Sequence, residues 1–280
     1  MVMPCCKMIL AIGPYIGNFE QEILTFRPYT RWLWEIWGTE YDKLYVNTHF
    51  NRMFLYDFLP KENLIPVFEN LTRDELNQKG YIHRSIKPKD YQILVKNMKD
   101  IIMDKENCGK KDIQVEGVGY IKSTPPIPIH RKKFTKIECD IENEFKDHIV
   151  FIPLNRDNRD RLAGVKQHLK DIDKDTIIIG SKKTRFRDEN VVLNRVDYTE
   201  NGYKVMVKIV SEARAVFCPI SHWTTICNLQ GAPVFSWGEQ PGQHKPGGIY
   251  NFGNKNCLAL PISPISVMRE MIDYFLEGRK

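Results

Sequence analysis

The stretch AVFCPISHWTTICNLQGAPVFSWG, residues 215 to 238, decides the fold. Its first four residues are apolar and predict a buried strand, and a polar turn over residues 219 to 222 leads into a helix that begins near Trp223. Gly231 predicts the end of this helix, and a second apolar strand follows over residues 233 to 237. A strand, helix and strand in this order are typical of a parallel sheet that binds a ligand at the carboxyl ends of its strands.

Ser221, Thr224 and Thr225 place three hydroxyl groups at the start of this helix. The unpaired N–H groups of a helix N-terminus and the helix dipole favour anions, so the turn is a candidate anion site. A simpler alternative is that Ser221 only caps a buried helix.

The composition is that of a globular protein with a full core, because 42% of the 280 residues are hydrophobic and 27% are charged. The net charge of +6 favours anionic ligands such as nucleotides, phosphates or nucleic acid, although a solvated surface slightly rich in lysine explains it equally well. The seven cysteines have no framework or CxxC spacing, which predicts a reducing, cytoplasmic environment. The sequence shows no signal peptide and no apolar run of the about 20 residues that span a membrane.

The first half of the chain opens as strand, loop, helix and strand. The apolar run over residues 7 to 12 predicts a buried strand, and the loop that follows contains Gly13 and Gly17. A helix is expected to run from this loop to about Trp37, and Pro28 should kink or split it.

A second alternation of strands and helices begins near Lys146. We therefore expect two α/β domains, each with a mainly parallel sheet. The first covers residues 1–146 and the second residues 147–265, and a final amphipathic helix covers residues 266–280.

Two loops of the second half follow predicted strands, residues 155 to 161 and residues 181 to 187. Their polar or basic residues include Asn155, Arg156, Arg159, Lys182 and Lys183. Arginine forks suit phosphate oxygens, although the aspartates of the first loop are competing partners for its arginines. Because parallel strands share one carboxyl edge, both loops and the turn at Ser221 converge there. This convergence predicts a polyanionic ligand, most simply a nucleoside diphosphate.

No metal site is predicted, because no DxD pair stands beside the predicted diphosphate and the seven histidines show no ligand spacing. Glu20 and Glu22 fall in the first turn of the N-terminal helix. Each is either a solvated first-turn carboxylate or a general base that faces a cleft. Arg131 and Lys132 lie in the proline-rich basic segment 123 to 136, which is an interdomain connection, an acceptor-binding loop or a nucleic-acid contact.

Two α/β domains with an N-terminal glycine loop and a C-terminal diphosphate edge resemble the GT-B glycosyltransferases. The likeness is closest to their heptosyltransferase-like branch, whose first loop and proline-containing helix are matched by residues 16 to 18 (IGN) and 26 to 28 (FRP), followed by Arg31. The branch has an aspartate, its presumed base, where this chain has Asn18. Glu20 would therefore have to replace that base, or the acceptor is deprotonated differently, or the protein does not transfer sugars.

The C-terminal signature of the branch is matched at Ser221, Gly231 and Pro233. Ile220 stands where the signature has an aspartate, and Thr225 where it has a histidine. The residues that shape the turn are therefore kept, whereas residues that would face a ligand there have changed.

The resemblance implies two Rossmann-like domains that face a cleft, and a metal-independent glycosyltransferase that needs no cofactor. It would move a sugar from a nucleotide-sugar donor in the second domain to a hydroxyl acceptor in the first, either a glycan or a lipid-linked sugar. The final helix would cross back onto the first domain. Catalysis would fall to Glu20 and Asn18, and acceptor binding to Arg131 and Lys132. The donor-binding residues would be Gly17, Asn155, Arg156, Arg159, Lys182, Lys183, Ser221, His222, Trp223, Thr224 and Thr225.

Two other functions stay open. The basic residues 130 to 133 and the net charge of +6 also fit a phage-type glycosyltransferase that acts on hydroxymethylated bases of DNA. Asn18 in place of the aspartate fits a non-catalytic protein of this fold that binds a nucleotide or a glycan.

Overall fold

The computed structural model describes residues 8–17, 19, 22–37, 40–67, 88–116, 134–154, 157–180, 191–193 and 202–278. It divides into two compact units, Met1–Phe134 and Thr135–Lys280. The division falls earlier in the chain than residue 146, because Ile137 is bonded to the second unit. Its N–H donates to Gln230 Oε1 and its carbonyl accepts from Gln230 Nε2, each at 2.9 Å.

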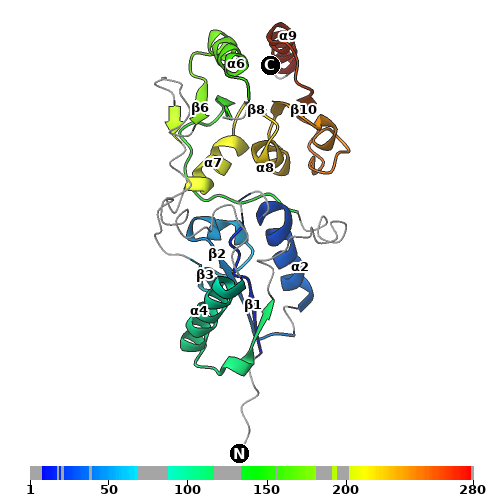
Figure 1. The fold of residues 1–280 in the computed structure, drawn as a ribbon. Coiled ribbons are helices and arrows are strands. Elements are labelled where there is room, and N and C mark those ends of the chain that lie inside the picture. Colours follow the sequence, from blue (N-terminus) through cyan, green and yellow to red (C-terminus); the bar gives the residue numbers. More distant parts are fainter. Residues whose placement is uncertain are drawn as a thin grey trace, which may run out of the picture. The chain divides into compact units, whose positions relative to one another are not determined.

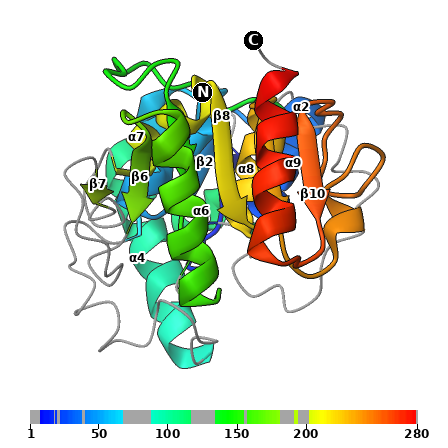
Figure 2. The same cartoon turned by 90° about the horizontal axis from the view of Figure 1, so that it is seen from above.

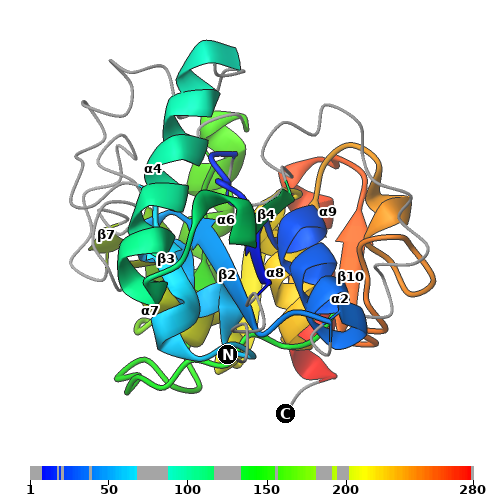
Figure 3. The same cartoon turned by 90° about the horizontal axis from the view of Figure 1, so that it is seen from below.

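The first unit is built on a parallel sheet of four strands in the order β3-β2-β1-β4, of which β1, β2 and β3 are labelled in Figure 1. The strands are β1 (Ile9–Ile12), β2 (Lys43–Thr48), β3 (Leu64–Pro66) and β4 (Ile113–Glu116). Helix α4 (Pro88–Glu106) lies along β2 and β3 (Figure 3). Its Met98 and Ile102 are buried in one cluster with Tyr45 and Ile65. The described part of the unit also contains three short 3₁₀ turns: η2 (Phe50–Tyr56), η3 (Lys61–Asn63) and η4 (Lys110–Asp112).

The N-terminal helical segment changes its winding just before Pro28. A π-helical turn, η1 (Glu22–Phe26), leads directly into α2 (Arg27–Trp37). Pro28 is the second residue of α2, and it has no backbone N–H to donate to the preceding turn. The segment is therefore divided at the proline, as its sequence predicts.

The second unit contains a parallel sheet of six strands in the order β10-β9-β8-β5-β6-β7. The strands are β5 (Ile149–Phe151), β6 (Ile177–Gly180), β7 (Val191–Leu193), β8 (Ala215–Pro219), β9 (Val234–Trp237) and β10 (Cys257–Leu260). Counted from β7 in chain order this is 3-2-1-4-5-6, the order of the doubly wound fold. The predicted α/β fold with two parallel sheets is confirmed.

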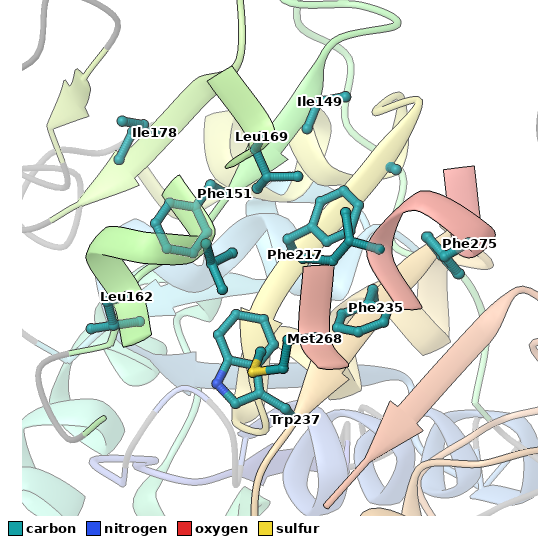
Figure 4. Packing of buried hydrophobic residues seen from close by; sticks show 13 residues of the cluster. Ile149, Phe151, Leu162, Leu169, Ile178, Phe217, Phe235, Trp237, Met268 and Phe275 are labelled. Atoms are coloured by element: carbon teal, nitrogen blue, oxygen red, sulfur yellow. The ribbon is translucent and has the colours of Figure 1, made fainter. Parts of the chain in front are cut away.

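Four helices of the second unit lie within the described residues. Helices α6 (Arg159–Ile172) and α9 (Ile265–Glu277) lie side by side over one face (Figure 2). There the rings of Phe217 and Phe235 contact the ring of Phe275, and Phe151 belongs to the same buried cluster (Figure 4). Helix α8 (His222–Gln230) contacts β8, β9 and α7 (Gly202–Ser211). A 3₁₀ turn, η6 (Pro241–Gln243), follows β9.

The final helix α9 packs onto the second unit. His168 of α6 lies 2.9 Å from Asp273 of α9, and Gly164 allows Ile265 a close approach. A Cβ atom at residue 164 would stand 2.9 Å from Ile265 Cγ1. None of the helices described is both long and apolar enough to cross a membrane.

Gly13 should tolerate no side chain. Its φ is +116°, and a Cβ atom would stand 2.6 Å from the backbone oxygen of Asn47. We expect Gly13→Ala to lower the free energy of unfolding by about 3 kcal/mol in urea denaturation. The control is Gly253→Ala, where φ is +83° but no atom lies within 4 Å, and where the strain alone should cost about 1 kcal/mol. Equal losses in the free energy of unfolding at both positions would contradict the expected clash with the Asn47 backbone.

Candidate functional site

The turn before α8 is held by reciprocal capping. Ser221 Oγ accepts a hydrogen bond from the Trp223 backbone N–H at 3.1 Å, and Thr224 Oγ1 accepts one from the Ser221 N–H at 3.2 Å. Gly231 ends the helix with φ of +73°. Ser221 is therefore a helix cap, as the simpler interpretation of the sequence proposed, and the cap fixes where the helix dipole points.

Three of the predicted donor-binding side chains on α8 turn into the core. Trp223, Thr224 and Thr225 are 2%, 0% and 1% exposed. Thr224 Oγ1 lies 3.5 Å from Cys218 Sγ, and Thr225 Oγ1 has no hydrogen-bond partner within the described part of the chain. Ser221 and His222 are only partly buried. An anion at this turn would thus meet the cap residues first and the buried residues only through their backbone.

The loop after β5 reaches the same edge of the sheet, since β5 pairs with β8. Asp157 ties this loop to β9: its Oδ2 accepts from Trp237 Nε1 at 2.6 Å, and its Oδ1 is paired with Arg161. The charge of Arg161 is therefore neutralised by Asp157 of its own loop. This is the competing pairing between aspartates and arginines that the sequence left open. Arg159 is exposed and makes no ion pair with any described residue.

Asn158 caps α6 next to this loop. Its Oδ1 accepts from the backbone N–H groups of Asp160 at 2.8 Å and of Arg161 at 3.1 Å. Two capped helix N-termini thus begin after β5 and β8, the neighbouring strands between which the strand order reverses. The other residues predicted for this site lie outside the described residues: Asn18, Glu20, Arg131, Lys132, Asn155, Arg156, Lys182 and Lys183.

In the first unit, the loop after β1 is braced at three points. The Gly13 N–H donates to the Glu116 carbonyl at 3.1 Å, and the Tyr15 N–H donates to the Asn47 carbonyl at 2.8 Å. Arg52 Nη1 donates to the Gly17 carbonyl at 2.7 Å. The loop, which contains the predicted site residue Gly17, is therefore fixed to β4, β2 and η2.

Glu22 lies buried behind this loop. Its Oε1 accepts from the Thr48 and Tyr56 hydroxyls, the latter at 2.8 Å, and its Oε2 lies 3.1 Å from Arg52 Nη1. Burial raises the pKa of Glu22, and the positive charge of Arg52 opposes this rise. The expectations of a solvated carboxylate or of a base that faces a cleft are both wrong for Glu22, because its side chain is 0% exposed and hydrogen-bonded at both oxygens.

Neither the partners of Glu22 nor the nearby His49 was predicted from the sequence. His49 is buried and bonded to the backbone of Ile16, and burial followed by the charge of Arg52 lowers its pKa well below 6.5. Thr48 is the last residue of β2, and His49 and Arg52 follow within four residues. Polar residues after a buried strand identified the candidate loops in the second half of the chain. The same pattern after β2 could have identified these residues.

Within the described part of the chain, no group of three or more His, Cys, Asp or Glu residues could hold a metal ion. The five cysteines described are all free thiols. Burial raises the pKa of Cys218 to about 12 and of Cys257 to about 11, so neither is activated as a nucleophile.

Solved structures match nearly the whole chain. The structure of E. coli heptosyltransferase WaaC with ADP has a TM-score of 0.50 and 9% identity, and the match covers 98% of this chain and 100% of that one. E. coli ADP-heptose lps heptosyltransferase II has a TM-score of 0.50 and 14% identity, with 97% and 99% covered. The fold is that of the GT-B glycosyltransferases. No protein-family model and no curated protein sequence matches the chain.

We expect Glu22→Leu to lower the free energy of unfolding by about 3–5 kcal/mol, because Arg52, Thr48 and Tyr56 would lose their buried acceptor. Urea denaturation measures the change. The control is Glu35→Ala on α2, whose partly exposed pair with Arg31 at 3.1 Å should contribute less than about 1 kcal/mol. A loss at Glu22 no larger than the loss at Glu35 would show that the buried cluster does not stabilise the unit.

Proposed function

We propose that this chain is a glycosyltransferase that moves a sugar from a nucleotide-sugar donor to a hydroxyl acceptor without a metal ion. The donor's diphosphate is proposed to bind at the N-termini of α6 and α8 in the second unit. The acceptor is proposed to bind at the carboxyl edge of the sheet in the first unit.

The observation that carries the donor assignment is the pair of helix N-termini on neighbouring strands. Helix α6 follows β5 and α8 follows β8, and these two strands are hydrogen-bonded neighbours at the point where the strand order reverses. Helix N-termini attract anions through their dipoles and through the first-turn N–H groups that a side-chain cap leaves unpaired, and open α/β sheets bind their ligands at this point. Arg159, exposed on the first turn of α6, adds a cation to the same edge.

The chemistry of the proposed reaction needs such an edge. When a sugar leaves a nucleotide-sugar, negative charge develops on the departing diphosphate. Fixed dipoles and an arginine fork stabilise that charge without reorganising, which is the contribution a divalent ion makes in other enzymes. Asp157, Trp237 and the two caps keep the helix N-termini in place before the ligand arrives.

The fold likeness supports the same ligand class. One of the matching structures, E. coli heptosyltransferase WaaC, was solved with ADP. The identity of 9% transfers the fold alone, so the nucleotide and the sugar are left for the experiment to choose.

A thermal-shift screen against ADP, UDP, GDP and their sugar conjugates tests the proposal. A ligand present at about 100 times its Kd should raise the free energy of unfolding by about 2.7 kcal/mol. Arg159→Glu should weaken the binding of the responding nucleotide about tenfold, because it places a negative charge beside the diphosphate.

Lys170→Glu is the matched control, since it reverses the same charge in the last turn of α6. It lies about 16 Å along the helix from Arg159, beyond the about 8 Å over which exposed charges act at physiological salt. Absence of any shift with every nucleotide, or an equal loss in both variants, would contradict the proposed donor site.

A further inference from the structure

Glu116 ends β4 at the place where the first sheet should bind a ligand. Its Cα is paired with that of Ile12, the last residue of β1, and its carbonyl accepts from the N–H of Gly13 at 3.1 Å. In the order β3-β2-β1-β4, the strand order reverses between β1 and β4. The carboxyl ends of these two strands are therefore the expected binding position in this sheet.

The side chain of Glu116 is held in one orientation by α2. Its Oε1 accepts a hydrogen bond from the Tyr29 hydroxyl at 2.9 Å. Burial, together with this bond to Glu116, raises the pKa of Tyr29, so the hydroxyl keeps its proton and stays the donor. The ring of Tyr29 in turn lies 5.7 Å from the ring of Trp32, one turn later on the helix. The position of the carboxylate is thus set by a packed aromatic pair.

The second carboxylate oxygen of Glu116 has no partner among the described residues. Across the described ranges of the chain, Oε2 has no hydrogen-bond donor and the carboxylate has no cationic partner. Two other glutamates of the same unit differ in this respect. Glu22 is bonded at both oxygens and paired with Arg52, and Glu106 is paired with Lys43 at 2.7 Å and also bonded to Tyr45. Only partly buried, Glu116 remains able to meet a ligand.

We propose that Glu116 binds the acceptor hydroxyl through Oε2 and removes its proton during transfer, which makes it the base of the reaction proposed above. The inference rests on that proposed function. As the acceptor oxygen forms its bond to the anomeric carbon of the sugar, the bond from that carbon to the diphosphate breaks. The bonding pair leaves with the nucleoside diphosphate, and the acceptor's proton passes to Glu116.

Glu116 would supply the base that the sequence lacks at position 18. The heptosyltransferase-like resemblance places a base at position 18, where this chain has an asparagine, and an amide is no proton acceptor at neutral pH. Glu116 supplies a carboxylate beside the same loop, on the neighbouring strand, and Tyr29 orients it. The base would then have moved from the loop after β1 to the end of β4.

Glu116→Gln tests the proposal, because the amide keeps the size of the side chain and an acceptor for Tyr29. The assay measures nucleoside diphosphate release from UDP-glucose, UDP-N-acetylglucosamine, ADP-glucose and ADP-heptose in the presence of a mixture of methyl glycosides. We expect Glu116→Gln to lower the rate at least about 100-fold while the thermal shift with the nucleotide is unchanged. Tyr29→Phe, which frees the carboxylate to rotate, should lower the rate about tenfold.

Glu106→Gln is the matched control, because it also converts a tyrosine-bound glutamate of the first unit but lies at the end of α4. It should leave the rate unchanged, and the melting temperature of each variant without ligand reports on folding. Equal rates in wild type and Glu116→Gln would overturn the proposal. So would a wild-type protein that binds a nucleotide sugar but releases no diphosphate, whereas a protein that binds no nucleotide contradicts the donor site itself.

Discussion

One guanidinium joins the buried carboxylate of Glu22 to the loop at the edge of the first sheet. Arg52 Nη1 lies 3.1 Å from Glu22 Oε2 and 2.7 Å from the carbonyl of Gly17. A charge removed from water needs a complete set of partners, and Thr48 and Tyr56 complete the set for Glu22. The loop cannot move without uncovering this cluster. The loop is rigid because moving it would leave a buried charge unpaired, which is costly in free energy.

In the second unit, too, a carboxylate fixes a loop at the edge of the sheet, and this carboxylate lies nearer the surface. Asp157 bonds the indole of Trp237 and the guanidinium of Arg161, and so joins the loop after β5 to the end of β9. This contact spans β8, which lies between the two strands in the sheet. Helices α6 and α8 consequently begin from fixed turns, and their dipoles can be aligned before a ligand binds. In both units a polar contact fixes the loops at the carboxyl edge of the sheet, where we propose that the ligands bind.

The strands and helices could be predicted because they depend on local patterns. Short apolar runs bounded by glycine or polar residues predicted β1, β5, β8 and β9, and Ser221 and Gly231 predicted the ends of α8. The parallel arrangement followed from the alternation of strands with helices. Even the division of the N-terminal helix at Pro28 followed from the chemistry of one residue.

The contacts that position the site could not be predicted in the same way. Glu22 finds its partners 26 and 34 residues away, at Thr48 and Tyr56, and no spacing rule connects them. The hydroxyls of Thr224 and Thr225 suggested an open, polar helix start, yet both are buried. Helix α8 is short and packs against β8, β9 and α7, so nearly all of its residues are covered and no polar face remains.

Hydrogen–deuterium exchange with and without the nucleoside diphosphate that stabilises the protein is the most direct test of the central claim, a diphosphate site at the N-termini of α6 and α8. Bound phosphate oxygens should slow exchange of backbone amides over residues 157 to 163 and 220 to 226, and leave α2 unchanged. Protection that appears in the first unit while both of these turns exchange as before would contradict the claim.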